Sequence, residues 1–438
     1  MMTAPPPPDT AGVQALQHRT VGTLMTSQVL GGVGVASGIA VAALMAAEIS
    51  GRDDLSGLAN TTQVLGGALI TIPIAALMAA RGRRVGLVAA YLIGTVGAAL
   101  AITAAVLGNF PLLLLGTALF GASSTANSQA RYAAVDLAPP KRRGRHLSLV
   151  VWATTIGSVL GPNILGPGKA LAESVGIPPL AGAWLFSAAG FLVAALVLSV
   201  LLRPDPLLTA RALADHSATD HPVVAPVAGT VARVPTVRQR GSIAHGLRQI
   251  LASPVLRLGT LAVTGGHVVM VAVMVMTPIH MAHGDAQVEV IGFVISMHIL
   301  GMYGLSPVAG YLTDRWGARP VILGGVLIQV AACVLAALSV AGWSVGLLAG
   351  LFLLGLGWSC TMVAGSGLIA AVSTVADRAA VQGASDLVMG LSAAAAGALA
   401  GVVVQHLGYD WLGAAGAVIA VALGFYTVTH RPSDPPPQ

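Results

Sequence analysis

The chain alternates between long apolar segments and short polar connections. A transmembrane helix needs about 20 mostly apolar residues, and twelve segments meet this requirement, in two groups of six. The expected spans of the first group are Val21–Glu48, Leu58–Ala80, Val85–Leu107, Pro111–Ala133, His146–Ala170 and Leu180–Leu202. Those of the second group are Pro254–His280, Val288–Leu312, Pro320–Ala341, Ser344–Gly367, Ala379–Gln405 and Tyr409–Thr429.

A polar stretch, residues 203–251, separates the two groups. It is rich in Pro, His, Asp and Arg and has no sustained apolar period, which predicts a mobile linker. We therefore expect an all-α membrane protein with twelve transmembrane helices. Its expected parts are a cytoplasmic tail (1–20), a six-helix bundle (21–202), a cytoplasmic linker (203–251), a second six-helix bundle (252–430) and a tail (431–438).

The composition agrees with a membrane protein and excludes other classes. Hydrophobic residues make up 55% of the chain and charged residues 9%, whereas soluble domains carry about 25% charged residues. This excludes a soluble enzyme, a disordered chain and a nucleic-acid binder. No nucleophile–base pair or nucleotide-binding loop is present, so we expect no catalysis and no bound cofactor. Cys333 and Cys360 lie in apolar segments, which favours buried thiols over a disulfide.

The basic residues predict the orientation in the membrane. Positively charged residues collect in cytoplasmic loops, and here nearly all of them lie in the even-numbered connections. Only Arg52 and Lys169 fall on the other side. Both termini are therefore expected in the cytoplasm, with the first span serving as an uncleaved insertion signal. The preference for Arg over Lys suggests a GC-rich bacterial gene and hence the inner (plasma) membrane. The sequence gives no sign of oligomerisation, so we expect a monomer.

A loop after the eighth span reads Gly310-Tyr-Leu-Thr-Asp-Arg-Trp-Gly-Ala-Arg319. Glycine permits a tight turn and close helix approach, and a carboxylate such as Asp314 can cap a neighbouring helix end. Such a latch favours one of two transporter states. The corresponding loop after the second span has Ala79 at the aspartate position, so the latch residue is missing there. The candidate gating residues are Gly310, Asp314, Arg315, Gly317 and Arg319.

This loop resembles the G-x-L-x-D-R-x-G-x-R motif of the major facilitator superfamily. The resemblance implies the major facilitator fold, two six-helix bundles that alternate access to a site near the bilayer midplane. A second motif, G-x-x-x-G-P in the fifth span, comprises Gly157, Gly161, Pro162 and Gly166. In the superfamily it is associated with antiporters, but a packing seam with a kink explains it equally well.

Methionine and histidine concentrate in residues 267–302, which hold six of the 13 Met and four of the 11 His. Met270 and Met274 share one face of the seventh span, and His298 and Met302 share one face of the eighth. If these spans are adjacent, the four side chains converge. Thioether and imidazole ligands select copper, although Met in a membrane helix more often fills space.

The four residues resemble the metal site of the CcoA-like copper importers, a branch of the superfamily. That resemblance implies copper uptake across the inner membrane, supplying cytochrome oxidase assembly, with copper as substrate. The alternative is a carrier of a small organic solute, either drug or metabolite export or riboflavin-like uptake, because the spans are apolar and poor in charge. A receptor or assembly factor without transport is a third reading, and the loop motif argues against it.

Other residues are candidates for secondary roles. His280, Met281 and His283 lie at the outer end of the seventh span as possible metal-entry ligands, with His267 as a further ligand or a core histidine. Asp386 and Glu48 are the candidate coupling groups, because a proton-coupled carrier needs a titratable group in the membrane. Asp136 is expected to pair locally with Arg131. The expected partners are copper or a small molecule and the lipid bilayer.

Overall fold

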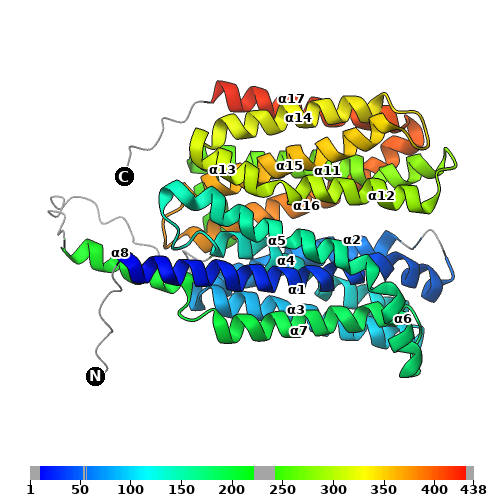
Figure 1. Cartoon of the computed structure of the whole chain (residues 1–438), viewed down its shortest axis with the longest axis horizontal. Helices are drawn as coiled ribbons and strands as arrows, with labels where there is room; N and C mark the ends of the chain where they lie inside the picture. Colours follow the sequence, from blue (N-terminus) through cyan, green and yellow to red (C-terminus); the bar gives the residue numbers. More distant parts are fainter. Residues whose placement is uncertain (1–9, 53–54, 56, 221–241, 431–438) are drawn as a thin grey trace.

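The computed structural model describes residues 10–52, 55, 57–220 and 242–430, and two helical bundles lie side by side in it (Figure 1). The first bundle holds α1 (Thr10–Ser50), α2 (Gly57–Arg81), α3 (Arg83–Leu107), α4 (Phe110–Ala133), the 3₁₀ turn η2 (Pro140–Arg142), α5 (Arg143–Asn163), α6 (Leu165–Ser174) and α7 (Ala181–Leu201). The second holds α11 (Pro254–Ala282), α12 (Val288–Ile299), the π-helix η3 (Leu300–Gly304), α13 (Ser306–Trp316), α14 (Ala318–Ala337), α15 (Val345–Val372), α16 (Arg378–His406) and α17 (Tyr409–Thr429).

Each of the twelve expected spans overlaps a helix or a run of consecutive helices, which confirms the all-α membrane fold. Among the described residues, ten helices are long and apolar enough to cross a membrane, or eleven if the bent pair α5–α6 counts as one span. The remaining expected span is α4, which has 24 residues and buries polar side chains such as Thr125 and Gln129. Its polarity places it at the junction between the halves rather than against lipid.

Local sequence signals account for several helix ends. Asn109, Ser253 and Ser344 each accept a hydrogen bond from a backbone N–H in the first turn of the following helix. Side-chain oxygens at this position satisfy donors that have no partner within the helix. Gly108 ends α3 in the left-handed conformation that glycine adopts without strain (φ 61°).

The prediction that the linker lacks regular structure is wrong at both of its ends. The structure forms α8 (Pro206–Asp220) and α10 (Ile243–Ala252) there, while 221–241 lie outside the described residues. On α10, Ile243, Gly246 and Ile250 are buried, an apolar stripe at helical spacing. Such a stripe is too short to stand out in a segment that is otherwise polar. Helix α1 begins at Thr10, within the predicted cytoplasmic tail 1–20.

The fifth expected span is broken rather than gently bent. Its two parts, α5 and α6, meet at an angle of 61° across a short break after Gly161. Proline cannot donate the helical hydrogen bond and breaks the ladder, and Pro162 and Pro167 flank this break. Before the break, α5 packs backbone to backbone on α1, because a Cβ atom on Gly157 would lie 2.6 Å from the carbonyl carbon of Gly32.

Substituting this glycine tests the close packing. We expect Gly157→Ala to destabilise the protein by about 1–3 kcal/mol, because the added methyl group overpacks the α1–α5 contact. Thermal unfolding of the purified protein in detergent measures the effect. Gly166→Ala is the matched control, since a Cβ atom at Gly166 meets nothing within 4 Å. Equal unfolding midpoints for the two variants would contradict the assignment.

Candidate functional site

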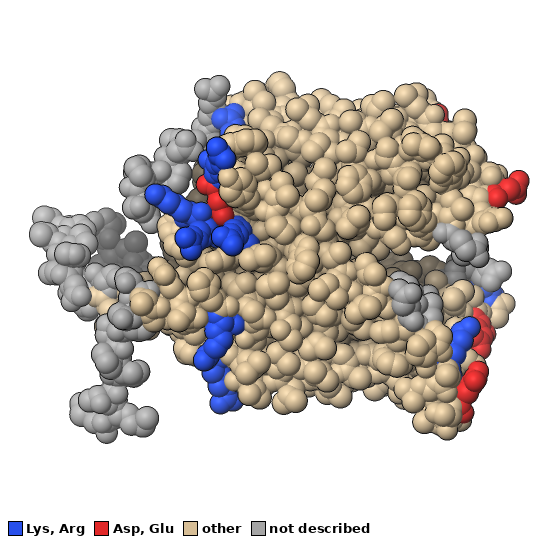
Figure 2. Space-filling view, in the orientation of Figure 1, with Lys and Arg blue, Asp and Glu red and all other residues tan. Residues whose placement is uncertain are grey.

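The two ends of the molecule differ in charge and in how closely the halves meet. Basic residues gather at one end, which we call the arginine-rich end (Figure 2). It carries Arg81, Arg84, Lys141, Arg142, Arg315 and Arg319. The hydrogen bonds and ion pairs described below join the halves at or near this end, whereas Figure 2 shows a hollow between the halves at the opposite end. The structure is therefore closed at the arginine-rich end.

One seam of this closure joins α5 to α13. The Asp314 carboxylate accepts hydrogen bonds from the backbone N–H groups of Gly144 (2.7 Å) and Arg145 (2.8 Å), in the first turn of α5. A carboxylate at this position also interacts favourably with the helix dipole. Gly310 lets the two backbones approach, because a Cβ atom there would lie 2.5 Å from the carbonyl oxygen of Gly144. Asp314 thus caps a helix of the other half.

The remaining predicted gating residues support α13 and the loop after it. Gly317 adopts a φ of 85°, which glycine tolerates. Arg319 donates to the carbonyl oxygens of Thr427 and Val428 at the end of α17. Arg315 is exposed and donates to Tyr311 on its own helix. None of these three contacts crosses between the halves.

The other seam, between α2 and α16, has no such cap. Ala79 takes the place of an aspartate, and Asp205 of the same half accepts the N–H of Arg84 (2.7 Å) instead. Small residues let α2 and α16 pack closely, and Gly383 lies directly against Ala75. One seam therefore closes by hydrogen bonds to a charge and the other by close packing.

Between the seams lies a buried ion pair that joins the halves. Arg131 of α4 contacts Asp386 of α16 at 2.5 Å, and Gln129 donates to the same carboxylate at 2.7 Å. The Nε of Arg131 also donates to Ser366 of α15 at 3.2 Å. Asp386, a predicted coupling residue, is thus held by two side chains of the opposite half. The second coupling candidate, Glu48, is exposed near the far end of α1.

A second buried group continues this network. Asp136 accepts from Arg83 (2.8 Å) and from Arg378 of the other half (3.5 Å), and Arg83 also donates to Gln382 of α16. The expected local pair of Asp136 with Arg131 is therefore wrong. The bend after α4 turns Asp136 toward α3, while Arg131 faces α15 and α16.

A group of aromatic side chains lies in the second half, on α11, η3 and α15. Trp358 of α15 donates its indole N–H to the Nδ1 of His267 (2.8 Å), and Tyr303 packs edge-on against Trp358 with ring centroids 5.4 Å apart. Trp358 lies on the same helix as Ser366, which accepts a hydrogen bond from Arg131. Tyr303 lies on η3, a π-helix, and such irregular turns are frequent at functional sites.

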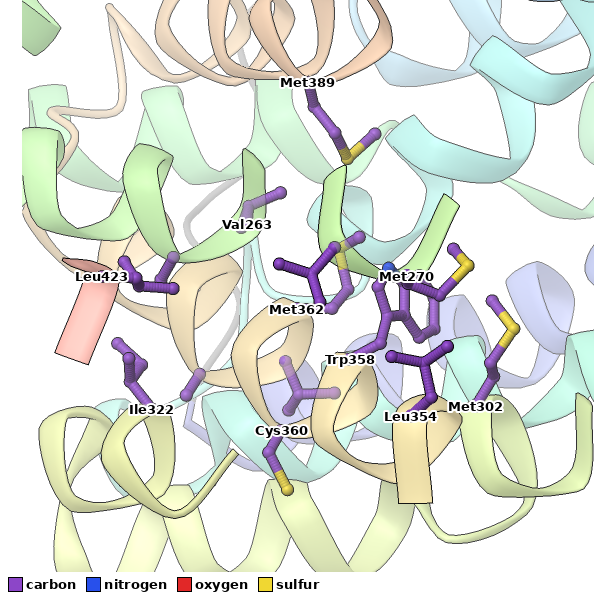
Figure 3. Packing of buried hydrophobic residues seen from close by; sticks show 14 of the residues in the cluster. Val263, Met270, Met302, Ile322, Leu354, Trp358, Cys360, Met362, Met389 and Leu423 are labelled. Atoms are coloured by element: carbon purple, nitrogen blue, oxygen red, sulfur yellow. The ribbon is translucent and has the colours of Figure 1, made fainter. Parts of the chain in front are cut away.

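The predicted Met/His quartet is only partly brought together. The expected direct packing of the seventh and eighth spans is replaced by packing of both on α15, because Gly259, Gly355 and Gly365 let α11 and α12–η3 approach that helix. Met270 and Met302 lie in one buried cluster with Leu354 and Trp358 (Figure 3). Met274 is half-buried and packs against the same cluster.

In His298, the histidine of the quartet, only one of the two ring nitrogens forms a hydrogen bond within the described residues. His298 is fully buried, and its Nδ1 lies 2.7 Å from the carbonyl oxygen of Leu351. A carbonyl only accepts, so Nδ1 carries the proton, and the lone pair of Nε2 has no partner among the residues that the structure describes. A histidine that donates Nδ1–H to a carbonyl is the usual arrangement of a metal ligand.

The predicted metal-entry residues do not form one site. His280 bonds Ser339 and Val340 and stacks on Tyr409, Met281 is fully buried, and His283 is exposed. His267 lies with Trp358, far along α11 from this end. Within the described ranges, no three His, Cys, Asp or Glu side chains are grouped to hold a metal. Cys333 and Cys360 are free, buried thiols, as expected.

Sequence reasoning missed four residues of this site, which are Gln129, Arg131, Tyr303 and Trp358. A signal for Arg131 was present, because a charge inside an apolar span is costly and marks function or pairing. Its partner is 255 positions away in the chain. No local pattern identifies a partner at that distance.

Removing the Asp314 cap tests the latch. We expect Asp314→Ala to raise the labelling rate of an engineered Ser306→Cys thiol at least about tenfold, because two charge-assisted bonds of about 1.5–3 kcal/mol each are lost. Ser306 is fully buried at the same seam. Glu173→Ala, at the opposite end, serves as the control. An unchanged rate would exclude Asp314 as a latch, and reaction of the buried native thiols would reveal unfolding instead.

Comparison with known proteins identifies the family. A sequence model of the Major Facilitator Superfamily matches residues 24–286 and 268–438. The uncharacterized MFS-type transporter YddS of Bacillus subtilis is 35% identical over 408 residues, 93% of this chain and 90% of YddS. The riboflavin transporter RfnT of Brucella anthropi is 27% identical over 400 residues, 90% of this chain and 92% of RfnT.

The fold agrees with this assignment. The human organic anion transporter MFSD10 superimposes with a TM-score of 0.74 at 15% identity, covering 94% of this chain and 99% of MFSD10. At that identity the similarity shows the fold alone. The family match spans nearly the whole chain, and the chain belongs to the major facilitator superfamily of membrane transporters.

Proposed function

We propose that this transporter carries a small organic solute across a bacterial plasma membrane by alternating access. The observation that carries the proposal is the group of His267, Tyr303 and Trp358, because Trp358 is buried and lies on α15, the helix whose Ser366 accepts a hydrogen bond from Arg131. Transporter substrates bind near the midplane between the two halves. Aromatic rings with a few polar groups at that position suit an organic ligand.

The closed end indicates which transport state the structure represents. With the arginine-rich end and both termini in the cytoplasm, as the basic residues predict, the site faces outward. Release to the cytoplasm then requires the α5–α13 and α2–α16 seams to separate. The same movement pulls Arg131 away from Asp386, because they belong to different halves.

The side chains favour a flat, heteroaromatic solute. Trp358 and Tyr303 offer ring surfaces for stacking, worth about 0.5–1.5 kcal/mol per pair beyond the buried area. The imidazole of His267 and the guanidinium of Arg131 provide hydrogen bonds to ring nitrogens and oxygens. The relative RfnT is a riboflavin transporter, so uptake of a flavin is the specific form of the proposal.

Asp386 is the proposed coupling group. A carboxylate that leaves its arginine partner during the transport cycle is exposed to protonation, and a proton can replace the lost pairing. Its burial between the halves means that protonation and gate opening are linked. Coupling through Asp386 would allow the proton gradient to drive accumulation of the solute.

Copper uptake is the second candidate, and one observation favours it. The unpartnered Nε2 of His298 lies in the same half as Met270 and Met302, which share a buried cluster. Against it, His298 faces α15, and the methionines are in contact with apolar side chains. The organic-solute proposal adds a group of the first half, Arg131, to the aromatic side chains of the second half, and alternating access needs contributions from both.

Uptake measurements distinguish the two candidates. In a riboflavin-auxotrophic bacterium without its own importer, we expect the wild-type chain to accumulate radiolabelled riboflavin. Trp358→Ala should lower uptake several-fold to about tenfold, because one stacking surface is lost. Trp343→Ala, an exposed tryptophan in the α14–α15 connection, is the matched control.

Accumulation of radioactive copper by the same cells tests the copper candidate. Copper accumulation that is lost in Met270→Ala and His298→Ala, without riboflavin uptake, would replace the organic-solute proposal by the copper candidate. Accumulation of neither compound above empty membranes would reject both substrates. Protein levels in the membrane are matched by immunoblotting in every arm.

A separate experiment tests coupling. We expect Asp386→Asn to abolish accumulation against a gradient, because the side chain no longer takes up a proton, while riboflavin exchange between equal concentrations continues. Exchange also shows that the variant is folded. Glu48→Gln, the other candidate coupling residue, should accumulate riboflavin normally. Accumulation by Asp386→Asn at the wild-type level would make Asp386 a purely structural partner of Arg131.

A further inference from the structure

A pocket of about 420 Å³ lies at the arginine-rich end, outside the transport site. It is formed by the first turns of α1, the connection after α4, the η2 turn and the start of α5. Its lining includes Gln17 and His18 from α1 and Lys141, Arg142 and His146 from the other segments. These side chains take part neither in the contacts described for the α5–α13 and α2–α16 seams nor in the Arg131–Asp386 ion pair.

The pocket carries positive charge without a balancing acid. Lys141 and Arg142 are exposed at its edge, and no Asp or Glu belongs to its lining. Neither side chain forms an ion pair with a carboxylate in the described part of the chain. The nearest acid in sequence, Asp136, is buried and already paired with Arg83 and Arg378. The electrostatic character of the pocket is therefore that of an anion site.

His146 supplies a directed donor. The amide nitrogen of Gln17 lies 2.6 Å from the carbonyl oxygen of Ala134, so it donates there, and its second hydrogen meets Nδ1 of His146 at 2.8 Å. Nδ1 is thus the acceptor and Nε2 carries the ring proton. His146 is 6% exposed as a residue, but its Nε2 is not among the buried side-chain atoms without a partner. The Nε2–H is therefore accessible from the pocket and can donate to an occupant.

The pocket adjoins the α5–α13 latch. Lys141, Arg142 and His146 flank Gly144 and Arg145, whose N–H groups bind Asp314. An occupant held by these three side chains and by His18 would connect α1 to the first turn of α5. The first turn of α5 is the part of the first half to which Asp314 binds. A bound phosphate would therefore fix the position of the N–H groups that Asp314 contacts.

We propose that this pocket binds a phosphate group, from a phospholipid headgroup or from a phosphate-bearing small molecule. Phosphate offers several acceptor oxygens and one to two negative charges, which match the Nε2–H of His146 and the two cationic side chains. The arginine-rich end is where the anionic headgroups of a cytoplasmic leaflet would lie. Both sources share the phosphate chemistry that the pocket recognises.

Thermal unfolding of the purified full chain in a neutral detergent tests this site. The probes are inorganic phosphate, dioctanoyl phosphatidylglycerol and, as a zwitterionic comparison, dioctanoyl phosphatidylcholine. We expect phosphatidylglycerol to raise the unfolding midpoint by about 2–4 °C more than phosphatidylcholine does. The difference should vanish in Lys141→Gln/Arg142→Gln, whose exposed side chains are not needed for folding, and in His146→Ala.

A double variant with the same charge loss controls for diffuse electrostatics. Arg203→Gln/Arg248→Gln removes two exposed charges at the same end, outside the pocket, and should respond to the probes like the wild type. A shift with phosphatidylglycerol alone assigns a lipid headgroup, and a shift with inorganic phosphate as well assigns free phosphate compounds. Equal shifts in all variants, or no shift with either phosphate probe, would overturn the proposal.

Discussion

Charge burial between the two halves governs the architecture of this transporter. Five Arg and Asp side chains are buried in the described part of the chain, namely Arg83, Arg131, Arg378, Asp136 and Asp386. A buried charge is stable only when it is paired and hydrogen-bonded, and removing its partner costs about 3–5 kcal/mol. Because two of the pairs, Arg131–Asp386 and Arg378–Asp136, cross from one half to the other, the halves are held together at one end. Opening that end requires water, a proton or a substrate to take over the broken contacts.

The surrounding structure is arranged so that these pairs can form. Glycine and alanine along α2, α5, α13 and α16 let the backbones approach closely enough for side chains to meet across the junction. Polar residues that would be costly against lipid lie on α4, where Gln129 and Arg131 face α16. The aromatic group on α11, η3 and α15 shares α15 with Ser366, which accepts a hydrogen bond from Arg131 of the ion pair.

The sequence predicted the features that depend on local or repeated patterns. The spans follow from apolar segments, and the placement of Asp314 against the first turn of α5 is the geometry its motif suggested. Pairings distant in sequence could not be read from such patterns, which is why Arg131 was matched with the wrong acid. The Met270/Met274 and His298/Met302 pairs were placed on facing helices because their helices are consecutive, but α11 and α12 touch little and both pack mainly on α15. The helix α10 was missed since its apolar stripe spans only two turns, and α8 lies in a segment whose composition is polar.

The α2–α16 seam has Ala79 where the α5–α13 seam has Asp314. The two seams of the closed end therefore respond differently to salt concentration. Contacts of the partly exposed Asp314 carboxylate weaken as ionic strength screens them, whereas the α2–α16 contact consists of small side chains and backbone, which salt barely affects. Rising salt concentration therefore loosens one side of the closed end and leaves the other intact. Of the two seams that must separate, the α5–α13 seam is thus the one that weakens first as salt concentration rises.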